Sequence, residues 1–285
     1  MAKILITGVT GTLGSMLSRM LLEDVDNEIV GISRDEQKQR QVPTHPRLKL
    51  RLADIRDGGS VARVVGSEKI DYIFHLAALK CVDTLEYHPY EAIQTNVLGT
   101  QNMVDIADSY QSRLVFTSTD KACYPVNAYG CSKALAEKIV LDAGHAVVRY
   151  GNVLGSRGSF LPNLILSLKT EGKAYITHKD MTRFWMSASG AAHFVRDVGL
   201  SHLDGVKVPE KIQASSISNF VKAVASFCGV EKYEIGEIGI RPGEKLSETL
   251  VTKEEGGMIT SADKDVQFNY KSLERFIIDV LKDGK

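Results

Sequence analysis

The sequence lacks the cysteine and histidine patterns that bind metals or build disulfide frameworks. Its four cysteines include no C-x-x-C pair, and its seven histidines form no H-E-x-x-H or similar set. Scattered thiols of this kind are typical of a reducing cytosol, and the histidine pattern argues against a metal site. We therefore expect a cytoplasmic protein that holds no metal.

The sequence also lacks a charge excess and long apolar runs. Its 35 basic and 35 acidic residues give no reason to expect a nucleic acid or an anionic membrane as a partner. The densest basic cluster, residues 47–52, alternates with leucines and predicts a half-buried strand. No apolar run could span a bilayer, and a first strand starting at Lys3 argues against a signal peptide.

What the sequence does contain is an alternation of strand-like and helix-like segments through its first half. The expected strands cover residues 3–7, 28–33, 48–53, 71–75, 113–117 and 146–150. Helical patterns lie between them, at residues 13–22, 60–65, 90–109 and 128–142. This alternation predicts an α/β fold with a Rossmann-like, doubly wound parallel sheet.

The rhythm changes after Gly151, where glycine-rich turns separate isolated helical patterns at 161–168, 191–198, 216–227 and 273–281. A late strand near 206–209 is expected to rejoin the sheet. The length suits a nucleotide-binding domain with a smaller lobe. We assign residues 1–150, with a return segment near 187–212, to a dinucleotide-binding domain. Residues 151–186 and 213–285 then form a substrate-binding lobe.

A glycine-rich turn, T-G-V-T-G-T-L-G, joins the first strand to the first helix. Gly8 permits the tight turn, Gly11 lets backbone N–H groups approach a pyrophosphate, and Gly14 allows close helix–strand packing. The spacing is G-x-x-G-x-x-G and not the dehydrogenase G-x-G-x-x-G, but the strand–turn–helix context is the required one. The turn therefore predicts a dinucleotide site.

The end of the second strand indicates which dinucleotide binds. NAD-binding chains usually place a carboxylate there, whereas this chain has Ser33 and Arg34. A hydroxyl and a guanidinium suit a 2′-phosphate, so we expect NADP; the alternative is that Arg34 simply faces solvent. Asp54, after the third strand, is placed either to accept from the adenine amino group or to cap the next helix.

Further positions complete the expected cofactor site. Ala77 and Ala78 are small where a dinucleotide must pass close to the backbone, although packing alone would explain them almost as well. Asn96, inside a helix, either hydrogen-bonds across to the active-site strand or faces water. The expected cofactor set is Gly8, Thr10, Gly11, Thr12, Leu13, Gly14, Ser33, Arg34, Asp54, Ile55, Ala77, Ala78, Lys80, Asn96, Tyr129 and Lys133.

The segment Ser118-Thr119-Asp120-Lys121 follows an apolar run that predicts a buried parallel strand. It should therefore lie at the carboxyl edge of the sheet, where open α/β sheets bind ligands. Tyr129 and Lys133 share one helix face, and an ammonium near a phenol would let Tyr129 exchange a proton near neutral pH. Y-x-x-x-K by itself more often marks a solvated helix face, but its place after S-T-D-K favours an active site.

Together these motifs resemble the extended short-chain dehydrogenase/reductase superfamily. The shared motifs are the glycine turn, D-I-R-D at 54–57, H-L-A-A at 75–78, N-V-x-G-T at 96–100 and Y-x-x-x-K. A narrower set resembles the C5-inverting UDP-N-acetylglucosamine 4,6-dehydratases that open pseudaminic acid synthesis. That set is S-R-D-E at 33–36, A-A-L-K at 77–80, S-T-D-K-A at 118–122, R-Y-G-N-V at 149–153, G-S-R-G-S at 155–159, M-T-R-F-W at 181–185 and R-P-G-E-K at 241–245.

The resemblance spans about residues 3 to 250, and the chain departs from the family by being shorter in three places. The family usually has a longer segment between its Y-x-x-x-K helix and V-R-Y-G-N, and the 34–48 loop and the C-terminal lobe are also trimmed here. The trimming leaves the chemistry in place and affects the expected contacts between subunits.

The resemblance implies a reaction in which C4 of the sugar is oxidised, water is eliminated across C5–C6, and C6 is reduced with the same hydride. It implies Tyr129, supported by Lys133, as the base for the C4 hydroxyl, Asp120 as the acid at C6, and Lys121 or a nearby group as the C5 base. Thr119 would bond a sugar hydroxyl or merely the loop backbone. A lysine base must be neutral when it acts, so we expect burial or nearby cations to depress the pKa of Lys121.

The resemblance also implies a UDP-sugar bound by Lys80, Asn152, Arg157, Arg241 and Glu244. A guanidinium suits a phosphate and a carboxylate suits ribose hydroxyls, although R-P-G-E could be only a turn with a surface ion pair, and Asp120-Lys121 only a local ion pair. The superfamily commonly pairs through helices that here cover about 90–109 and 128–142, so we expect a homo-oligomer.

Two other interpretations of the function stay open. The first is a UDP-sugar 4-epimerase or a C5-retaining 4,6-dehydratase; simple epimerisation needs no acid at C6, which argues for dehydration. The second is a catalytically dead NADP-binding sensor module. Such modules typically lose the tyrosine and lysine that this chain keeps at Tyr129 and Lys133.

Overall fold

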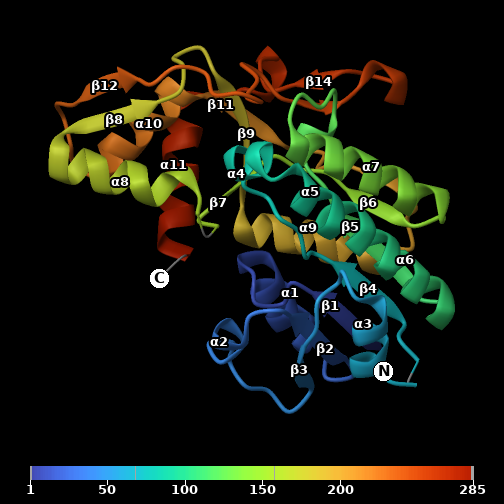
Figure 1. Cartoon of the computed structure of the whole chain (residues 1–285). Coiled ribbons are helices and arrows are strands. Elements are labelled where there is room, and N and C mark those ends of the chain that lie inside the picture. The colour runs from blue at the N-terminus through green and yellow to red at the C-terminus, as the bar shows by residue number, and fades with distance from the viewer. Residues whose placement is uncertain (1, 68, 157, 284–285) are drawn as a thin grey trace.

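The computed structural model describes residues 2–67, 69–156 and 158–283. Within these residues, seven parallel strands form the main sheet in the order β10-β6-β5-β4-β1-β2-β3 (Figure 1). They are β1 (Lys3–Thr7), β2 (Glu28–Ser33), β3 (Leu48–Leu52), β4 (Tyr72–His75), β5 (Arg113–Thr117), β6 (Ala146–Val148) and β10 (Gly205–Lys207). This arrangement confirms the predicted Rossmann-like sheet, and β10 is the late strand expected to rejoin it.

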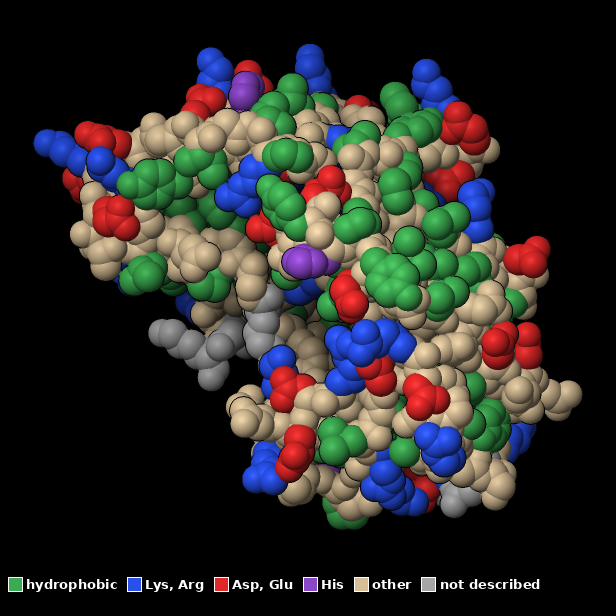
Figure 2. All heavy atoms as spheres, viewed as in Figure 1, with side chains coloured by type: hydrophobic (Ala, Val, Ile, Leu, Met, Phe, Trp, Pro, Cys, Tyr) green, Lys and Arg blue, Asp and Glu red, His purple; other side chains and the backbone are tan. Residues whose placement is uncertain are grey.

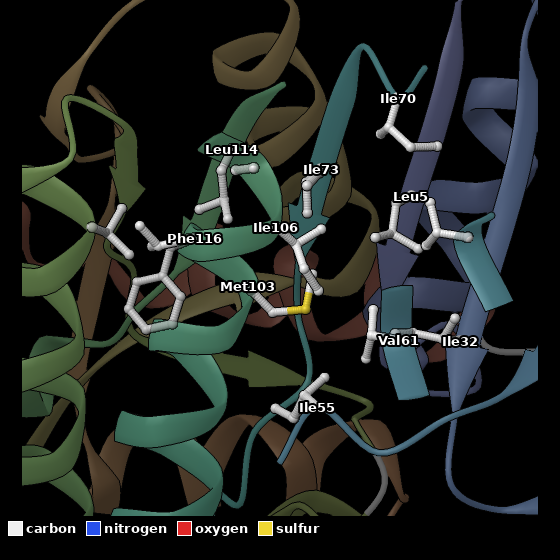
Figure 3. Packing of buried hydrophobic residues seen from close by; sticks show 14 of the residues in the cluster. Leu5, Ile32, Ile55, Val61, Ile70, Ile73, Met103, Ile106, Leu114 and Phe116 are labelled. Carbon is white, nitrogen blue, oxygen red and sulfur yellow. The ribbon is translucent and has the colours of Figure 1, made fainter. Parts of the chain in front are cut away.

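Helices cover both faces of this sheet. On one face, α3 (Gly58–Val65), α6 (Gly99–Tyr110) and α7 (Ala128–Asp142) pack against it through residues such as Val61, Met103 and Ala136 (Figure 3). On the other face lie α1 (Thr12–Leu22) and α9 (Ala188–Leu200), which contact each other. Because both faces are covered, the central strands read as continuous apolar runs, and Ile4, Leu5 and Ile6 are fully buried.

The order of the strands in the main sheet determines where a ligand-binding crevice opens. Strand β1 lies between β2, which follows it, and β4, so successive strands are added on opposite sides of β1. Such a switch point opens a crevice at the carboxyl ends of the strands. Thr7 pairs in register with Ile32 on one side and with His75 on the other, which brings the ends of three strands to one level.

The helix predicted at 90–109 is made of three segments. They are α5 (Pro89–Ala92), the π-helix η1 (Ile93–Leu98) and α6, and a short α4 (Val82–Tyr87) precedes them. A π-helical stretch inside a helix often marks a functional site. Here it carries Asn96, whose contacts are described below.

A second core lies among the residues that follow β6. It is built on α8 (Phe160–Glu171), α10 (Ile217–Phe227) and α11 (Tyr270–Asp283), and Trp185 stacks on Phe220 at its centre. Figure 1 shows these three helices together, apart from β1, β2 and β3. The chain after β6 also contains short strands: β7 (Asn152–Leu154), β8 (Lys173–Ile176), β9 (Thr182–Ser187), β11 (Gln213–Ser216), β12 (Glu234–Glu237), β13 (Thr249–Val251) and β14 (Ile259–Thr260).

The remaining described elements are short: α2 (Glu36–Gln39), η2 (Asp120–Ala122), η3 (Lys253–Glu255) and η4 (Lys264–Val266). In the part of the chain that the structure describes, no helix combines the length and apolarity needed to cross a membrane.

Candidate active site

A cleft of about 980 Å³ opens at the carboxyl ends of β1, β4 and β5. One part of its wall comes from the glycine turn and the ends of β2 and β4. Another part comes from β5, α7, Trp185 of the second core and the exposed Arg241. The cleft therefore joins the expected cofactor site to the expected substrate site.

The glycine turn has the geometry that a dinucleotide pyrophosphate requires. Gly8 has a φ of +69°, and a Cβ there would lie 3.0 Å from the Cα of Ala77. A Cβ on Gly14 would lie 2.4 Å from the carbonyl oxygen of Gly8, so a side chain there would push α1 away from β1. Gly11, Thr10, Thr12 and Leu13 also line the cleft, so these residues fit the cofactor.

A buried histidine that the sequence analysis missed fixes the loop opposite the glycine turn. His75 Nε2 is 3.0 Å from the hydroxyl of Thr100, which itself donates to the Asn96 carbonyl, so Nε2 carries the proton. Its Nδ1 then accepts from Thr7 at 2.8 Å, and the same Thr7 oxygen accepts from the backbone N–H groups of residues 76 and 77. Burial lowers the pKa of His75 to about 3, so the ring stays neutral. Ala77 and Ala78 are thereby held against the cleft.

Asn96 does not take the cofactor-binding place expected of it. Its side chain is buried and bonds both the N–H and the carbonyl of Leu79, at 2.8 and 2.9 Å, and the hydroxyl of Ser132 at 3.0 Å. The amide ties the loop after β4 to α7. Asn96 thus holds two elements of the site together. It does form a hydrogen bond across the site, as one of the two expectations had it, but to Leu79 and Ser132 and not to the active-site strand.

The end of the cleft beside β2 carries charges of both signs. Ser33, Arg34, Asp35 and Lys38 line it, and Lys38, which the sequence analysis did not select, pairs with Asp35 at 2.8 Å. Arg34 is 45% exposed and lies 3.5 Å from Asp54. The two cations and the hydroxyl suit a phosphate group, and the Asp35 carboxylate lies at the same opening.

Asp54 has different partners from those expected. Its carboxylate pairs with Arg56 at 2.7 Å and with Arg34. Burial alone would raise the pKa of Asp54, but these arginines outweigh it and lower the pKa. The cap of α3 is Asp57 and not Asp54, so the capping interpretation was wrong. Ile55 lines the cleft beside it, as expected.

Tyr129 and Lys133 both reach the cleft from the first turns of α7. That helix begins at the cap Asn127, whose side chain accepts from the N–H of Gly130 at 2.6 Å. A Cβ on Gly130 would lie 2.2 Å from the carbonyl oxygen of Lys121, so this glycine lets α7 approach the S-T-D-K segment. The sequence analysis placed these groups together correctly.

The pKa values of Tyr129 and Lys133 differ from the expectation. Lys133 is 2% exposed, its Nζ lies 3.8 Å from the centre of the Phe116 ring, and burial lowers its pKa to about 7. Burial and the negative charge of Asp120 raise the pKa of Tyr129 above its ordinary value. The expected lowering of the phenol pKa is therefore not seen, because the lysine lies over an aromatic ring and is itself hard to protonate.

Asp120 and Lys121 form a close pair after β5. Asp120 is fully buried, and one of its oxygens accepts from Lys121 at 3.0 Å and from the Thr119 hydroxyl at 2.9 Å. Lys121 also donates to Asn152 at 3.2 Å, and Thr119 and Lys121 both line the cleft. Burial raises the pKa of Asp120 against the opposing charge of Lys121, which favours a protonated carboxyl.

A second carboxylate, Glu248, faces the same lysine and was missed by the sequence analysis. Its Oε1 lies 3.5 Å from Lys121 Nζ. Burial alone would lower the pKa of Lys121, but Asp120 and Glu248 outweigh it and raise the pKa above its ordinary value. The expectation of a depressed lysine pKa is therefore wrong. No motif in the sequence pairs Glu248 with Lys121, because the contact depends on how the second core folds back.

The expected substrate residues gather in the cleft. Lys80, Asn152, Arg241 and Glu244 all line it, while Arg157 lies outside the described residues. The R-P-G-E turn is closed by the Glu244 carboxylate, which accepts from the N–H of Arg241 at 3.0 Å. The carbonyl of Gly243 in this turn accepts from Asn127 at 2.7 Å, which ties the turn to the start of α7.

Comparison with known proteins agrees with this architecture. The model of a family described as polysaccharide biosynthesis protein matches residues 4–269. A relative from Rickettsia felis named UDP-glucose 4-epimerase is 40% identical over 269 residues, which is 88% of this chain and 78% of that protein. A relative of the same name from Rickettsia akari is 39% identical over 269 residues, again 88% of this chain and 78% of that protein.

Solved structures show the same fold. The X-ray structure of Pen from Bacillus thuringiensis has a TM-score of 0.88 and 29% identity, and covers 98% of this chain and 97% of that one. The dTDP-glucose 4,6-dehydratase DesIV from Streptomyces venezuelae, solved with NAD bound, has a TM-score of 0.79 and 20% identity, over 99% of this chain and 97% of that one. At that identity the likeness concerns the fold. With the family match covering most of its length, the chain belongs to the polysaccharide biosynthesis protein family and has the fold of the extended short-chain dehydrogenase/reductases.

Proposed function

We propose that the protein is an NADP-dependent UDP-N-acetylglucosamine 4,6-dehydratase that inverts the sugar at C5. The observation that carries this proposal is the buried pair Asp120–Lys121 beside Tyr129 and Lys133 in one cleft. In this proposal residues 1–150, with 187–212, bind the dinucleotide, and residues 151–186 and 213–285 bind the sugar nucleotide.

Tyr129 and Lys133 would serve the C4 hydroxyl. Near neutral pH a fraction of Lys133 is neutral, because its pKa is about 7, and this amine would accept the proton that the C4 hydroxyl loses on oxidation. The Tyr129 phenol, whose pKa is raised, holds its proton in the resting state and can donate a hydrogen bond to the sugar. Bound NADP would accept and return the hydride in this chemistry.

Asp120 would supply the proton for the departing C6 hydroxyl. Its burial favours the protonated carboxyl that this role requires. Because Asp120 is fully buried, its proton reaches the sugar through the Thr119 hydroxyl or Lys121, both of which contact Asp120 and line the cleft. Epimerisation at C4 involves no leaving group at C6 and gives such a carboxyl no task.

NADP is the proposed cofactor because Ser33, Arg34 and Lys38 surround one end of the cleft. A 2′-phosphate would find there a guanidinium, an ammonium and a hydroxyl. The UDP moiety would lie toward Arg241 and Glu244, which the cleft joins to the catalytic residues.

We also propose that the protein pairs with a second copy through α5, η1 and α7. Tyr90, Ile93, Leu98 and Leu135 are exposed on these helices. Figure 2 shows hydrophobic side chains gathered over α5 and η1, in the place that Figure 1 gives these elements. A contiguous apolar patch of this kind is typical of an interface.

A UDP-sugar 4-epimerase is the second candidate, because the Rickettsia relatives carry that name at 39% and 40% identity. Mass spectrometry of the products, together with proton NMR to tell an epimer from unreacted substrate, separates the two. Incubation with UDP-N-acetylglucosamine and NADP should give a sugar nucleotide that has lost one water. An isomer of unchanged mass, formed with UDP-glucose or UDP-N-acetylglucosamine, would support the epimerase and overturn the dehydratase.

A further inference from the structure

Glu248 stands at the centre of a charged cluster on the cleft wall. Its side chain is 3% exposed, and its Oε1 lies 3.5 Å from Lys121 Nζ and 3.9 Å from Arg183 Nε. Its other oxygen lies 3.0 Å from Lys245 Nζ. Glu248, Lys121 and Arg183 all line the cleft, so the cluster borders the space where the sugar would lie.

The cluster affects the charge of Glu248 and of Lys121. Burial alone would raise the pKa of Glu248, but Lys121, Arg183 and Lys245 outweigh it and lower the pKa, so the carboxylate is ionised. The groups that face Lys121 are Asp120 from the same segment, Arg183 from β9, Glu248 just before β13, and the neutral Asn152. When Asp120 is ionised, two carboxylates against one guanidinium favour the ammonium form of this lysine, and when Asp120 is protonated, Glu248 alone favours it.

Glu248 and Asp120, the two carboxyl groups beside Lys121, differ in protonation. Burial favours the protonated form of Asp120, whereas three cations keep Glu248 negative. When Asp120 carries a proton, Glu248 is therefore the carboxylate that continues to balance Lys121. Glu248 belongs to the segment that follows the R-P-G-E turn. Through Glu248 this segment would contribute to the reaction as well as to substrate binding.

We propose that Glu248 is a positioning residue that holds Lys121 in the cleft as an ammonium group, and that Lys121 acts as the proton donor to C5. This inference rests on the proposed dehydration. In the step concerned, the electron pair of the sugar enolate forms the C5–H bond, the Lys121 N–H bond breaks, and the lysine is left as a neutral amine that regains a proton from solvent. An ammonium group cannot also remove the C5 proton beforehand. Removal and return are thus divided between two groups, which is what inversion at C5 requires.

The charge of Lys121 can be measured without any reaction. The protein is labelled with ¹³C- and ¹⁵N-lysine, the Lys121 resonance is assigned with Lys121→Arg, and the titration is followed by NMR. Lys121 in the wild type should still be protonated at about pH 10, and Glu248→Gln should lower the titration midpoint by at least about one pH unit. Glu237→Gln, an exposed carboxylate at the end of β12, should leave the midpoint unchanged. A wild-type midpoint below about pH 9, or no change in Glu248→Gln, would overturn the inference.

The reaction supplies the second test. The activity should fall at high pH as Lys121 loses its proton, and Glu248→Gln should move this alkaline limb to lower pH, with Glu248→Asp between the two. A fall in kcat by the same factor at every pH would mean a merely structural role and would overturn the proposal. If Glu248→Gln does not fold, Glu248→Asp and the wild-type titration decide the question. If the wild type yields no dehydrated product, the proposed function fails, while the NMR titration still tests the hold of Glu248 on Lys121.

Discussion

Replacing Lys133 by methionine should make the protein more stable while removing a proposed catalytic group. Lys133 is buried, and its ammonium nitrogen lies over the Phe116 ring. Burial lowers its pKa from the ordinary value of 10.5 to about 7, against the opposing effect of Glu137. Methionine keeps an unbranched, flexible chain in the same space and carries no charge.

The magnitude follows from the pKa. One pKa unit corresponds to about 1.4 kcal/mol, so the lowering from 10.5 to about 7 opposes folding by about 5 kcal/mol when the lysine is protonated in both states. The unfolded chain binds more protons here between pH 7 and 10.5, so the wild type gains stability across this window as the pH rises. About 4 kcal/mol of the penalty remains at pH 7, and about 2 kcal/mol at pH 9.

Urea unfolding at pH 7 and pH 9, without dinucleotide, tests this reasoning. Lys133→Met should be more stable than the wild type by several kcal/mol at pH 7, and the difference should shrink by about 2 kcal/mol at pH 9. Lys138→Met, an exposed lysine on the same helix, should show no such pH-dependent difference. A Lys133→Met protein that is less stable than the wild type, or equally more stable at both pH values, would refute the reasoning.

Three further predictions concern the site and the assembly. Arg34→Ala should weaken NADP binding by about tenfold or more and change NAD binding little, as measured by calorimetry; equal losses for both would contradict the 2′-phosphate assignment. Asp120→Asn should slow water loss about 100- to 10,000-fold while dinucleotide binding is kept, and a loss of less than about tenfold would make Asp120 structural. Light scattering at micromolar concentration should find a dimer that Tyr90→Glu with Leu98→Glu dissociates, and a wild-type species of 31.3 kDa would refute pairing.

The elements that carry the proposed catalytic groups could be predicted because their signals are local. Strands β1, β2 and β5 are bounded as their apolar runs indicate, and α7 begins after Asn127, the cap that a Pro-Val-Asn break places there. The glycine turn and the residues after β5 follow from the same local patterns. Buried parallel strands and capped helices are the features that a single sequence shows most clearly.

The parts that were missed depend on contacts between distant segments. The strands of the second core are short, and their pairing, such as β9 with β7 and β11, is visible only in the fold. The predicted direction of the Lys121 pKa shift was wrong because Glu248, which lies far from Lys121 in the sequence, has no local signature. Asn96 was assigned to the cofactor because a polar residue in a helix does not show which side it bonds, and the π-helical turn that carries it has no pattern of its own.

The central claim is dehydration with inversion, and proton NMR of the reaction in D₂O tests it most directly. The protein is incubated with UDP-N-acetylglucosamine and NADP, and spectra are taken from the first turnovers. We predict a 4-keto-6-deoxy sugar nucleotide with deuterium at C5 and the coupling constants of the L-arabino configuration. UDP-N-acetylgalactosamine, with its C6 hydroxyl kept and no deuterium at C5, would contradict the claim.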